Sequence, residues 1–241
     1  MVHSARLARC LPMWRISFVL CISLSSALPA AAVCLQPNPT IRAEFSHSDA
    51  VFVGTVISER ALLSDGESID GWYYSLRVEE AIRGLSSHDI AVYTGNDSGR
   101  YPLQVGRQYL LFVTNYEGRL EIYGCGNSGM LPEALGRERE VERVKLESEK
   151  ASTAMIEGRT FLTTGYGPTV SVVARGRNHT YSVVAGHDGW FHMKVRPGAY
   201  VIRAFFAKRK VPAFDLSWDN PGQIRVRAGQ CDLVQFRADG M

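Results

Sequence analysis

Short apolar and aromatic runs, separated by polar turn residues, fill the chain between residues 50 and 123. They are rich in β-branched and aromatic side chains and are bounded by Gly, Asp, Asn and Ser, which is typical of short β-strands. Gly54 interrupts the first run, and a glycine inside a strand favours a bulge or a tight bend, as barrel closure requires. The five predicted strands are 50–57, 72–78, 90–93, 108–114 and 119–123.

A charged segment with interspersed apolar residues follows at 131–146, LPEALGREREVERVKL. Pro132 stands where a first helical turn tolerates proline, and the pattern predicts a helix, although Gly136 weakens it. The polar residues 147–154 lack periodicity and indicate a linker, whose boundaries we set at 149–154.

A second set of strands with explicit turns fills the rest of the chain. Turn residues such as Asp188-Gly189 and Pro197-Gly198 recur every 8 to 12 residues or so, which favours a β-sandwich. The seven predicted strands are 155–162, 169–175, 180–185, 190–195, 199–207, 223–228 and 232–238.

The first 32 residues have the pattern of an export signal. Three arginines precede an apolar run at 16–28, and Ala30 to Ala32 follow it. The apolar run is shorter than the ~20 residues that a membrane-spanning helix needs. Retention by an uncleaved helix is the disfavoured alternative. We therefore expect a protein that is secreted or periplasmic/extracellular, with no stable membrane span.

Removal of this segment cancels the positive charge of the whole chain. Three of the 27 basic residues lie in the signal, which leaves 24 basic residues against 24 acidic ones. A balanced chain without long basic runs lacks the electrostatic footprint of a protein that binds nucleic acid or anionic membranes. The short basic run at 208–210 is interpreted as a solvated loop, and no nucleic-acid partner is expected.

Five cysteines occur in the chain, and Cys10 and Cys21 leave with the signal. Cys34, Cys125 and Cys231 remain in a compartment where disulfides persist. We expect one disulfide and one odd thiol.

Residues 34–125 resemble the tissue-inhibitor-of-metalloproteinase and netrin-like family. The resemblance rests on the order and spacing of several blocks, not on any one of them. It implies an OB fold, a five-stranded barrel flanked by helices. The blocks are Cys34 followed by Pro37 and Pro39, SDAVFVGTV at 48–56, YSLRVEEAIRG at 74–84, VGRQYLLFV at 105–113 and GRLEIYGCG at 118–126.

The resemblance further implies a disulfide between Cys34 and Cys125. It also implies a candidate protease-binding segment of Val33, Cys34 and Leu35. In the family, the amine and carbonyl of a first cysteine bind the zinc of the protease.

This chain departs from the family at both ends of a second disulfide. Ala32 stands where the first cysteine is expected, and Arg100 lies near the position of its partner. Cleavage after Ala32 would expose Val33, whose amine and carbonyl are ligands that zinc accepts. Without this disulfide, the N-terminal segment that begins at Val33 is less rigid, and ordering it on binding lowers the affinity.

The second half resembles carboxypeptidase regulatory-like, or prealbumin-like, sandwiches. The matching blocks are GPTVSVVA at 167–174, HDGWF at 187–191 and VRPGAYVIRA at 195–204. The expected fold is all-β: a five-stranded OB barrel with a flanking helix, plus a seven-stranded β-sandwich. The expected division is a signal peptide at 1–32, a netrin/TIMP-like barrel with a C-terminal helix at 33–148, the linker at 149–154 and the sandwich at 155–241.

Signatures of common enzymes are absent, including HExxH, GxSxG, the P-loop, GxGxxG and CxxC. His179, His187 and His192 with Cys231 are residue types that could bind zinc. A turn separates His187 from His192, however, so these two do not share a strand face by simple spacing. We interpret them as surface histidines and expect no metal and no cofactor.

The sequence therefore predicts a non-catalytic binding protein whose partner, a protein or a glycan, is unknown. One alternative is a metalloprotease inhibitor that acts through its N-terminal segment on an extracellular metalloprotease. Another is a structural or adhesive module of the cell envelope. OB barrels bind very different ligands, so the fold does not decide among these functions.

Overall fold

The computed structural model describes residues 38–162, 170–206, 209–211, 213–214 and 223–238, which all belong to one compact unit. The predicted signal peptide and the predicted protease-binding residues Val33, Cys34 and Leu35 lie outside the described residues. The described part consists mostly of strands with two helices, so the all-β prediction is confirmed.

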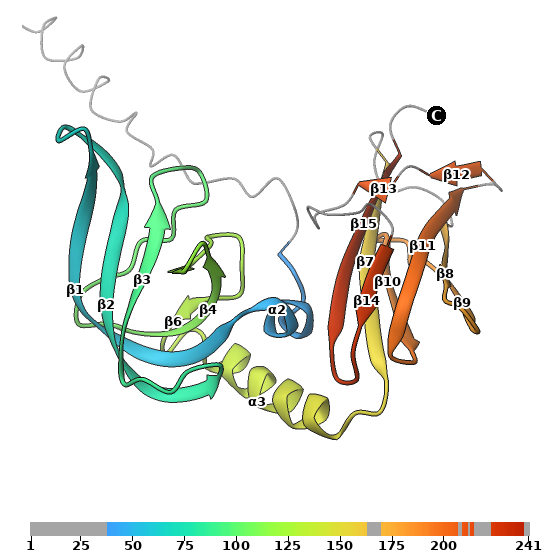
Figure 1. Cartoon of the computed structure of the whole chain (residues 1–241), viewed down its shortest axis with the longest axis horizontal. Helices are drawn as coiled ribbons and strands as arrows, with labels where there is room; N and C mark the ends of the chain where they lie inside the picture. Colours follow the sequence, from blue (N-terminus) through green and yellow to red (C-terminus); the bar gives the residue numbers. More distant parts are fainter. Residues whose placement is uncertain (1–37, 163–169, 207–208, 212, 215–222, 239–241) are drawn as a thin grey trace, which may run out of the picture. The chain divides into compact units, whose positions relative to one another are not determined.

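The N-terminal half is a sheet that closes on itself (Figure 1). Its strands follow the order β1-β2-β3-β5-β4-β6, and an additional antiparallel pairing of β1 with β4 completes a barrel. β3 and β5 pair in parallel, and the other neighbours are antiparallel. The strands are β1 (Ala50–Ser64), β2 (Ser68–Arg83), β3 (Asp89–Gly95), β4 (Gln108–Tyr116), β5 (Arg119–Glu121) and β6 (Gly129–Met130).

Alternating side chains of these strands fill the interior of the barrel. Phe52, Tyr74 and Leu111 are fully buried in one continuous apolar cluster. The predicted irregularity at Gly54 is confirmed, because the pairing of β1 with β2 shifts register between Val53 and Gly54. A side chain at Gly54 would meet the main-chain oxygen of Arg77, so the bend depends on glycine.

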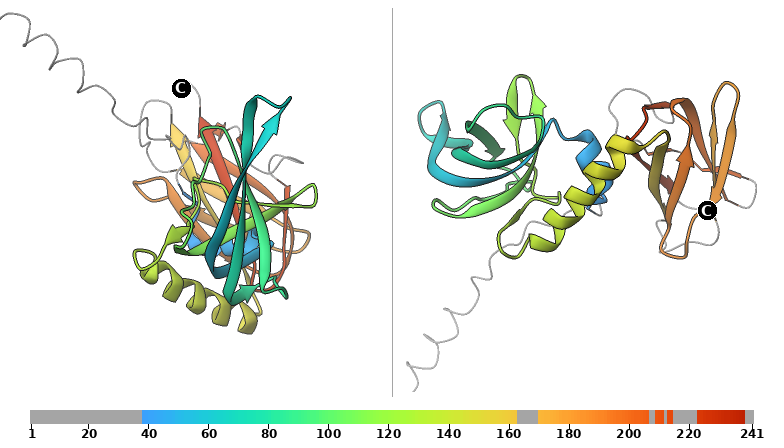
Figure 2. Two further views of the ribbon diagram at one scale, coloured as in Figure 1. Left: turned by 90° about the vertical axis from the view of Figure 1, so that its left-hand side faces the viewer. Right: turned by 90° about the horizontal axis from the view of Figure 1, so that it is seen from below.

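Two helices cover the outside of the barrel, and they lie side by side (Figure 2). α2 (Ile41–His47) begins at Thr40, whose hydroxyl accepts from the amide of Ala43. α3 (Leu135–Lys150) buries Val141 and Val144 against α2 and the outer side of β1 and β4. Burial of this second cluster explains why a helix with many charges is stable, since tertiary packing supplies most helical stability.

The helical predictions need three corrections. α3 begins at Leu135, not at 131, and the residues around Pro132 form turns before it. It ends at Lys150, so it takes up the first two residues of the predicted linker at 149–154, and β7 takes the last one. α2 was not predicted, because seven residues are too few to show a clear helical period.

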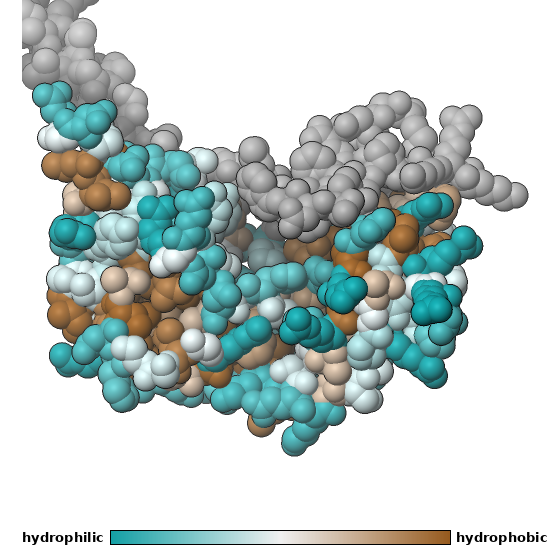
Figure 3. Space-filling model, in the orientation of Figure 1, coloured by the Kyte–Doolittle hydropathy of each residue, from teal (hydrophilic) through white to brown (hydrophobic). Residues whose placement is uncertain are grey.

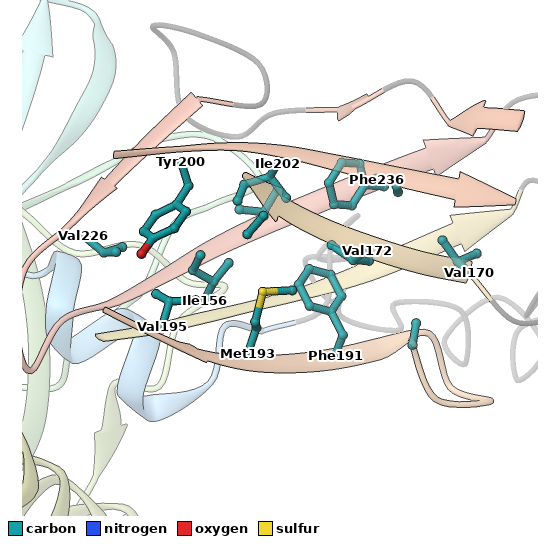
Figure 4. Packing of buried hydrophobic residues seen from close by; sticks show 14 of the residues in the cluster. Ile156, Val170, Val172, Phe191, Met193, Val195, Tyr200, Ile202, Val226 and Phe236 are labelled. Atoms are coloured by element: carbon teal, nitrogen blue, oxygen red, sulfur yellow. The ribbon is translucent and has the colours of Figure 1, made fainter. Parts of the chain in front are cut away.

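The C-terminal half is a β-sandwich of two sheets whose buried faces share one cluster (Figure 4). Phe191 and Met193 lie beside Ile156 and Phe236, and the rings of Phe191 and Phe236 are 6.3 Å apart. One sheet has the order β10-β7-β15-β13, and the other has the order β12-β11-β8-β9 with β14 on β11. The strands are β7 (Ala154–Leu162), β8 (Val170–Arg175), β9 (Thr180–Val184), β10 (Trp190–Val195), β11 (Gly198–Phe206), β12 (Arg209–Val211), β13 (Ala213–Phe214), β14 (Gln223–Val226) and β15 (Cys231–Ala238).

Each of the seven predicted C-terminal segments contains a strand, and β12 and β13 are two short strands that the sequence did not indicate. Gly189 has the positive φ of 80° that an Asp-Gly turn requires. β1 and β2 are much longer than the predicted 50–57 and 72–78, and their additional residues form a hairpin.

Candidate functional site

The distal halves of β1 and β2 form a two-stranded arm, residues 57–70, beyond the barrel (Figure 1). β1 pairs with β4 only as far as Thr55, and β2 pairs with β3 only from Gly71 onward. Within the described residues, residues 58–62 of β1 pair only with residues 71–75 of β2, and the hairpin beyond them, residues 63–70, pairs only with itself. Asp65 and Gly66 turn the chain with φ of 50° and 80°, as an Asp-Gly hairpin turn requires.

The tip of the arm carries an exposed apolar pair. Leu63 lies directly opposite Ile69, and their exposed fractions are 51% and 39%. Ile57, at the base of the arm, is 45% exposed. Figure 3 shows hydrophobic side chains near the end of the arm among polar ones. Cross-strand apolar pairs normally stabilise a sheet by facing a core, so an exposed pair on a projecting hairpin is a candidate contact surface.

A row of stacked side chains fixes the arm to the barrel. The rings of Tyr73 and Tyr93 are 5.2 Å apart on β2 and β3. The guanidinium of Arg60 lies 5.5 Å from the Tyr73 ring, and that of Arg119 lies 3.8 Å from the Tyr93 ring. The Tyr93 hydroxyl donates to the carbonyl of Asp70 over 3.0 Å, and burial raises its pKa. Cation–π contacts contribute ~0.5–2 kcal/mol each, so this row holds the arm in a defined direction.

A loop after β3 holds the other side of the hairpin. The amide of Asn96 donates to the carbonyl of Asp70 over 3.0 Å, and its side chain donates to the carbonyl of Ile69 over 2.9 Å. Asp97 closes the loop by accepting from the amide of Gly99 over 2.7 Å. The arm is therefore held at the carbonyls of Ile69 and Asp70 and at the side chain of Arg60 before any ligand binds. Preorganisation of this kind lowers the entropic cost of binding.

Sequence reasoning missed the arm, although a signal for it was present. The dipeptide Asp65-Gly66 is the strongest short-range indicator of a hairpin, and it stands between strand-forming residues. The polar residues around it were interpreted as a loop, because they lack the alternation of a half-buried strand. An arm exposed on both faces has no reason to alternate.

A second candidate site is the anchor of the first described residues. Asn127, two residues after Cys125, donates through its side chain to the carbonyl of Pro39 over 2.9 Å. Its amide and its side chain also donate to the same Glu44 oxygen, each over 2.6 Å. Arg137 donates to the carbonyl of Asn127 over 3.0 Å. These contacts fix Pro39 beside the loop that follows Cys125, and the side chain of Asn38 donates to the carbonyl of Gly126 over 3.5 Å.

Glu44 is the central charge of this anchor. Burial raises its pKa, and the hydrogen bonds from Asn127 and the charge of Arg137 oppose that rise. Gly126 leaves room for the carboxylate, because a Cβ there would lie 2.1 Å from a Glu44 oxygen. Cys125 is disulfide-bonded, and its expected partner Cys34 lies outside the described residues, so that pairing stays a prediction.

Cys231, the odd thiol, is buried and free. Its amide donates to the hydroxyl of Ser46 over 2.9 Å. Burial, reinforced by the neighbouring carboxylate of Glu157, strongly raises the pKa of the thiol. Because the thiolate is the reactive species, this side chain is not placed to act as a nucleophile at neutral pH.

The three C-terminal histidines lie in different environments. His179 is 3.2 Å from the guanidinium of Arg196, and His192 is 3.4 Å from the carboxylate of Glu157. His187 is exposed in the turn before β10. In the part of the chain that the structure describes, no three His, Cys, Asp or Glu side chains are grouped so as to hold a metal ion.

A hollow of about 570 Å³ lies where α3 leads into β7. Glu147 pairs there with Arg42 and Arg143, while Lys150 and Lys194 line its rim. Its described lining includes the hydroxyls of Ser152 and Thr153, and Glu147 is the one acidic residue among the described lining residues. Within the described ranges, no helix has the length and apolar character to cross a membrane.

No family model matches the chain, and no curated protein matches it. Among solved structures, it is similar to BcpA, the major pilin subunit of Bacillus cereus, at 7% sequence identity and a TM-score of 0.25. The match covers 82% of this chain and 61% of the pilin chain. A likeness at this level decides neither the fold nor the function, and both rest on the geometry of the chain itself.

Proposed function

We propose that this chain is a non-catalytic binding protein that contacts a protein partner through the β1–β2 arm. The observation that carries the proposal is the exposed Leu63–Ile69 pair at the tip of a braced hairpin. Both side chains are already about half buried, so burying the rest in an interface contributes roughly half of the ~1.5–3 kcal/mol of a full burial, about 1 kcal/mol each. Beyond Thr55, one edge of β1 has no strand partner among the described residues, so its main-chain donors and acceptors suit addition of a strand from the partner.

We assign the barrel to the OB class on the basis of its strand order. The order β1-β2-β3-β5-β4 with closure of β1 on β4 supports this assignment, as does the parallel β3–β5 pair. OB barrels bind ligands through the face of strands 2 and 3 and through the loops that join strands 1 to 2 and 4 to 5. In this chain, the first of those loops is the tip of the arm.

Site-specific photocrosslinking tests the role of the arm. A photoreactive residue is placed at Glu67 in the turn of the arm or, as a matched control, at the exposed Arg139 on α3. The purified protein is irradiated with the extracellular fraction of the cells that produce it. We expect an adduct of discrete mass from position 67 only, competed by the unlabelled wild type but not by Leu63→Ser/Ile69→Ser. Identical adducts from both positions, or equal competition by the arm variant, would refute the proposal.

Metalloprotease inhibition is the second candidate function, and the anchor at Glu44 and Asn127 favours it. That network holds residues 38 and 39 at the barrel, close in sequence to Val33, Cys34 and Leu35. A short tether to a rigid barrel lowers the cost of ordering an N-terminal wedge in an active site.

The inhibitor hypothesis has its own test, which does not depend on the arm. The mature protein is titrated against extracellular zinc metalloproteases with a fluorogenic peptide substrate. We expect inhibition that is lost when one residue is added before Val33, because the added residue displaces the chelating amine. Absence of inhibition would refute the inhibitor hypothesis. It would not affect the proposal for the arm, which the crosslinking experiment tests separately.

A further inference from the structure

The sheet formed by β12, β11, β8, β9 and β14 contains no acidic residue. Its inward positions, such as Val172 and Ile202, belong to the buried cluster of the sandwich. The alternate positions point to the opposite, outer face. Three arginines stand on that face, Arg175 on β8, Arg203 on β11 and Arg225 on β14, and all three are exposed.

The registers bring these arginines together from distant parts of the chain. Arg175 lies opposite Val201, and Arg203 lies opposite Val173 on the same pair of strands. The two arginines are therefore diagonal neighbours, ~7–8 Å apart at their backbone positions. Arg225 lies opposite Ala199, one strand farther across the sheet.

These charges have no described counter-ion. No ion pair or side-chain hydrogen bond joins any of the three guanidinium groups to another described residue. At the end of the sheet where Arg175 lies, Arg177 and Arg196 add two further exposed cations in the adjoining turns. Like charges repel one another, so the face gains stability when an anion lies across it.

The chemistry of the face narrows the class of anion. A guanidinium fork fits planar or tetrahedral oxyanions such as carboxylate and sulfate. The hollow between Val173, Val201 and Phe205 is about 150 Å³, smaller than the ~300 Å³ at which ligand pockets begin. It therefore does not suit a peptide that is anchored by a large side chain. Exposed hydroxyls at Thr180 and Ser182 on β9 flank the arginines and suit the hydroxyl groups of a sugar.

We propose that the outer face of this sheet binds an anionic polysaccharide whose repeat carries carboxylate or sulfate groups, recognised by Arg175, Arg203 and Arg225. The site is separate from the arm and from the N-terminal anchor. It makes the sandwich a second binding surface of the chain, directed to a glycan and not to a protein.

Affinity measurements with defined polymers test this site. The full mature protein is titrated with polygalacturonate, which presents carboxylates, and with heparin, which presents sulfates as well. Neutral dextran, polyglutamate and duplex DNA serve as comparison ligands. Arg175→Gln/Arg203→Gln/Arg225→Gln is compared with Arg77→Gln/Arg107→Gln/Arg139→Gln, which removes the same charge from exposed positions outside the sandwich.

We expect at least one anionic polysaccharide to bind. The sandwich variant should bind it about tenfold more weakly, because exposed ion pairs each contribute little. The control variant keeps its affinity, and Arg175→Lys/Arg203→Lys/Arg225→Lys recovers only part of the loss, because lysine has no fork. The ratio of polygalacturonate to heparin affinity identifies the preferred anion.

Three results would overturn the site. The first is equal affinity of the wild type and the sandwich variant for the polysaccharides. The second is an equal loss in the control variant, which would mean that only net charge matters. The third is polyglutamate or DNA binding as tightly as the best polysaccharide, which would assign the face to an acidic protein segment or to nucleic acid. Circular dichroism of each variant verifies that these exposed substitutions leave the fold intact.

Discussion

Gly158 lies where the two central strands of one sandwich sheet meet the aromatic core, and we predict that Gly158→Ala strongly destabilises the sandwich. Gly158 on β7 pairs in register with Val234 on β15. A Cβ at this position would lie 2.0 Å from the main-chain oxygen of Val234 and 2.4 Å from the Phe191 ring. Phe191 is fully buried against Phe236, so its ring has no free space to enter.

The geometry sets the size of the effect. Ordinary carbon contacts are ~3.5 Å or longer, so the new methyl group intrudes by roughly 1.5 Å. Overpacking of a core costs ~1–3 kcal/mol, and the obstacle here is a carbonyl of the strand ladder, which cannot rotate away. We therefore expect a loss of about 3 kcal/mol in the free energy of unfolding of the sandwich.

Urea denaturation measures this loss. Trp72 is the one tryptophan between residues 33 and 150, so a Trp72→Phe background makes the fluorescence report on the C-terminal half. With a slope of ~1–3 kcal/mol/M, the urea midpoint should fall by about 1–3 M. Gly136→Ala is the matched control, because a Cβ at Gly136 on α3 meets nothing within 4 Å. That change should stabilise the helix by up to ~1 kcal/mol and leave the midpoint of the C-terminal half no lower than in the wild type. A midpoint for Gly158→Ala at or above the wild type would refute the packing argument.

Three further predictions concern other parts of the chain. Because burial raises the pKa of Glu44, the folded protein binds the Glu44 proton more tightly than the unfolded chain does, and the stability that the protonated carboxyl contributes at low pH is lost as the pH rises above about 4.5. In urea denaturation, Glu44→Gln should therefore become increasingly more stable than the wild type as the pH rises. A trend in the opposite direction would contradict this. The guanidinium of Arg100 lies 3.3 Å from the centre of the Trp72 ring. Arg100→Lys should therefore lower the free energy of unfolding by about 0.5–2 kcal/mol, as thermal or urea denaturation would measure. An unchanged free energy of unfolding would mean that the stacking contributes nothing. Iodoacetamide should leave Cys231 unmodified in the folded protein and should label it in urea, as measured by the intact mass. Rapid labelling of the native protein would contradict the burial of this thiol and its raised pKa.

Strand content and most turn positions were predictable from local sequence alone. The β-branched and aromatic runs, the Asp188-Gly189 turn and the irregularity at Gly54 all follow from the conformational preferences of a few residues. The start of α3 was less predictable, because the helix depends on burial of Val141 and Val144 against the barrel more than on its own sequence. The same holds for α2, which is stabilised by a Thr40 cap and by a buried Phe45.

By itself, the sequence determined where strands form, because strand propensity and turn chemistry act over a few neighbouring residues. It also determined that the chain carries no net charge once the predicted signal is removed. Only the tertiary structure decided where the charges gather, since Arg175, Arg203 and Arg225 are far apart in the chain and become neighbours through the registers of β8, β11 and β14. It likewise decided that Leu63 and Ile69 face outward, because the arm extends past the last residues that pair with β4 and β3. Both candidate surfaces depend on long-range strand pairing. They could not be predicted from local sequence patterns, because such patterns do not indicate which distant strands pair.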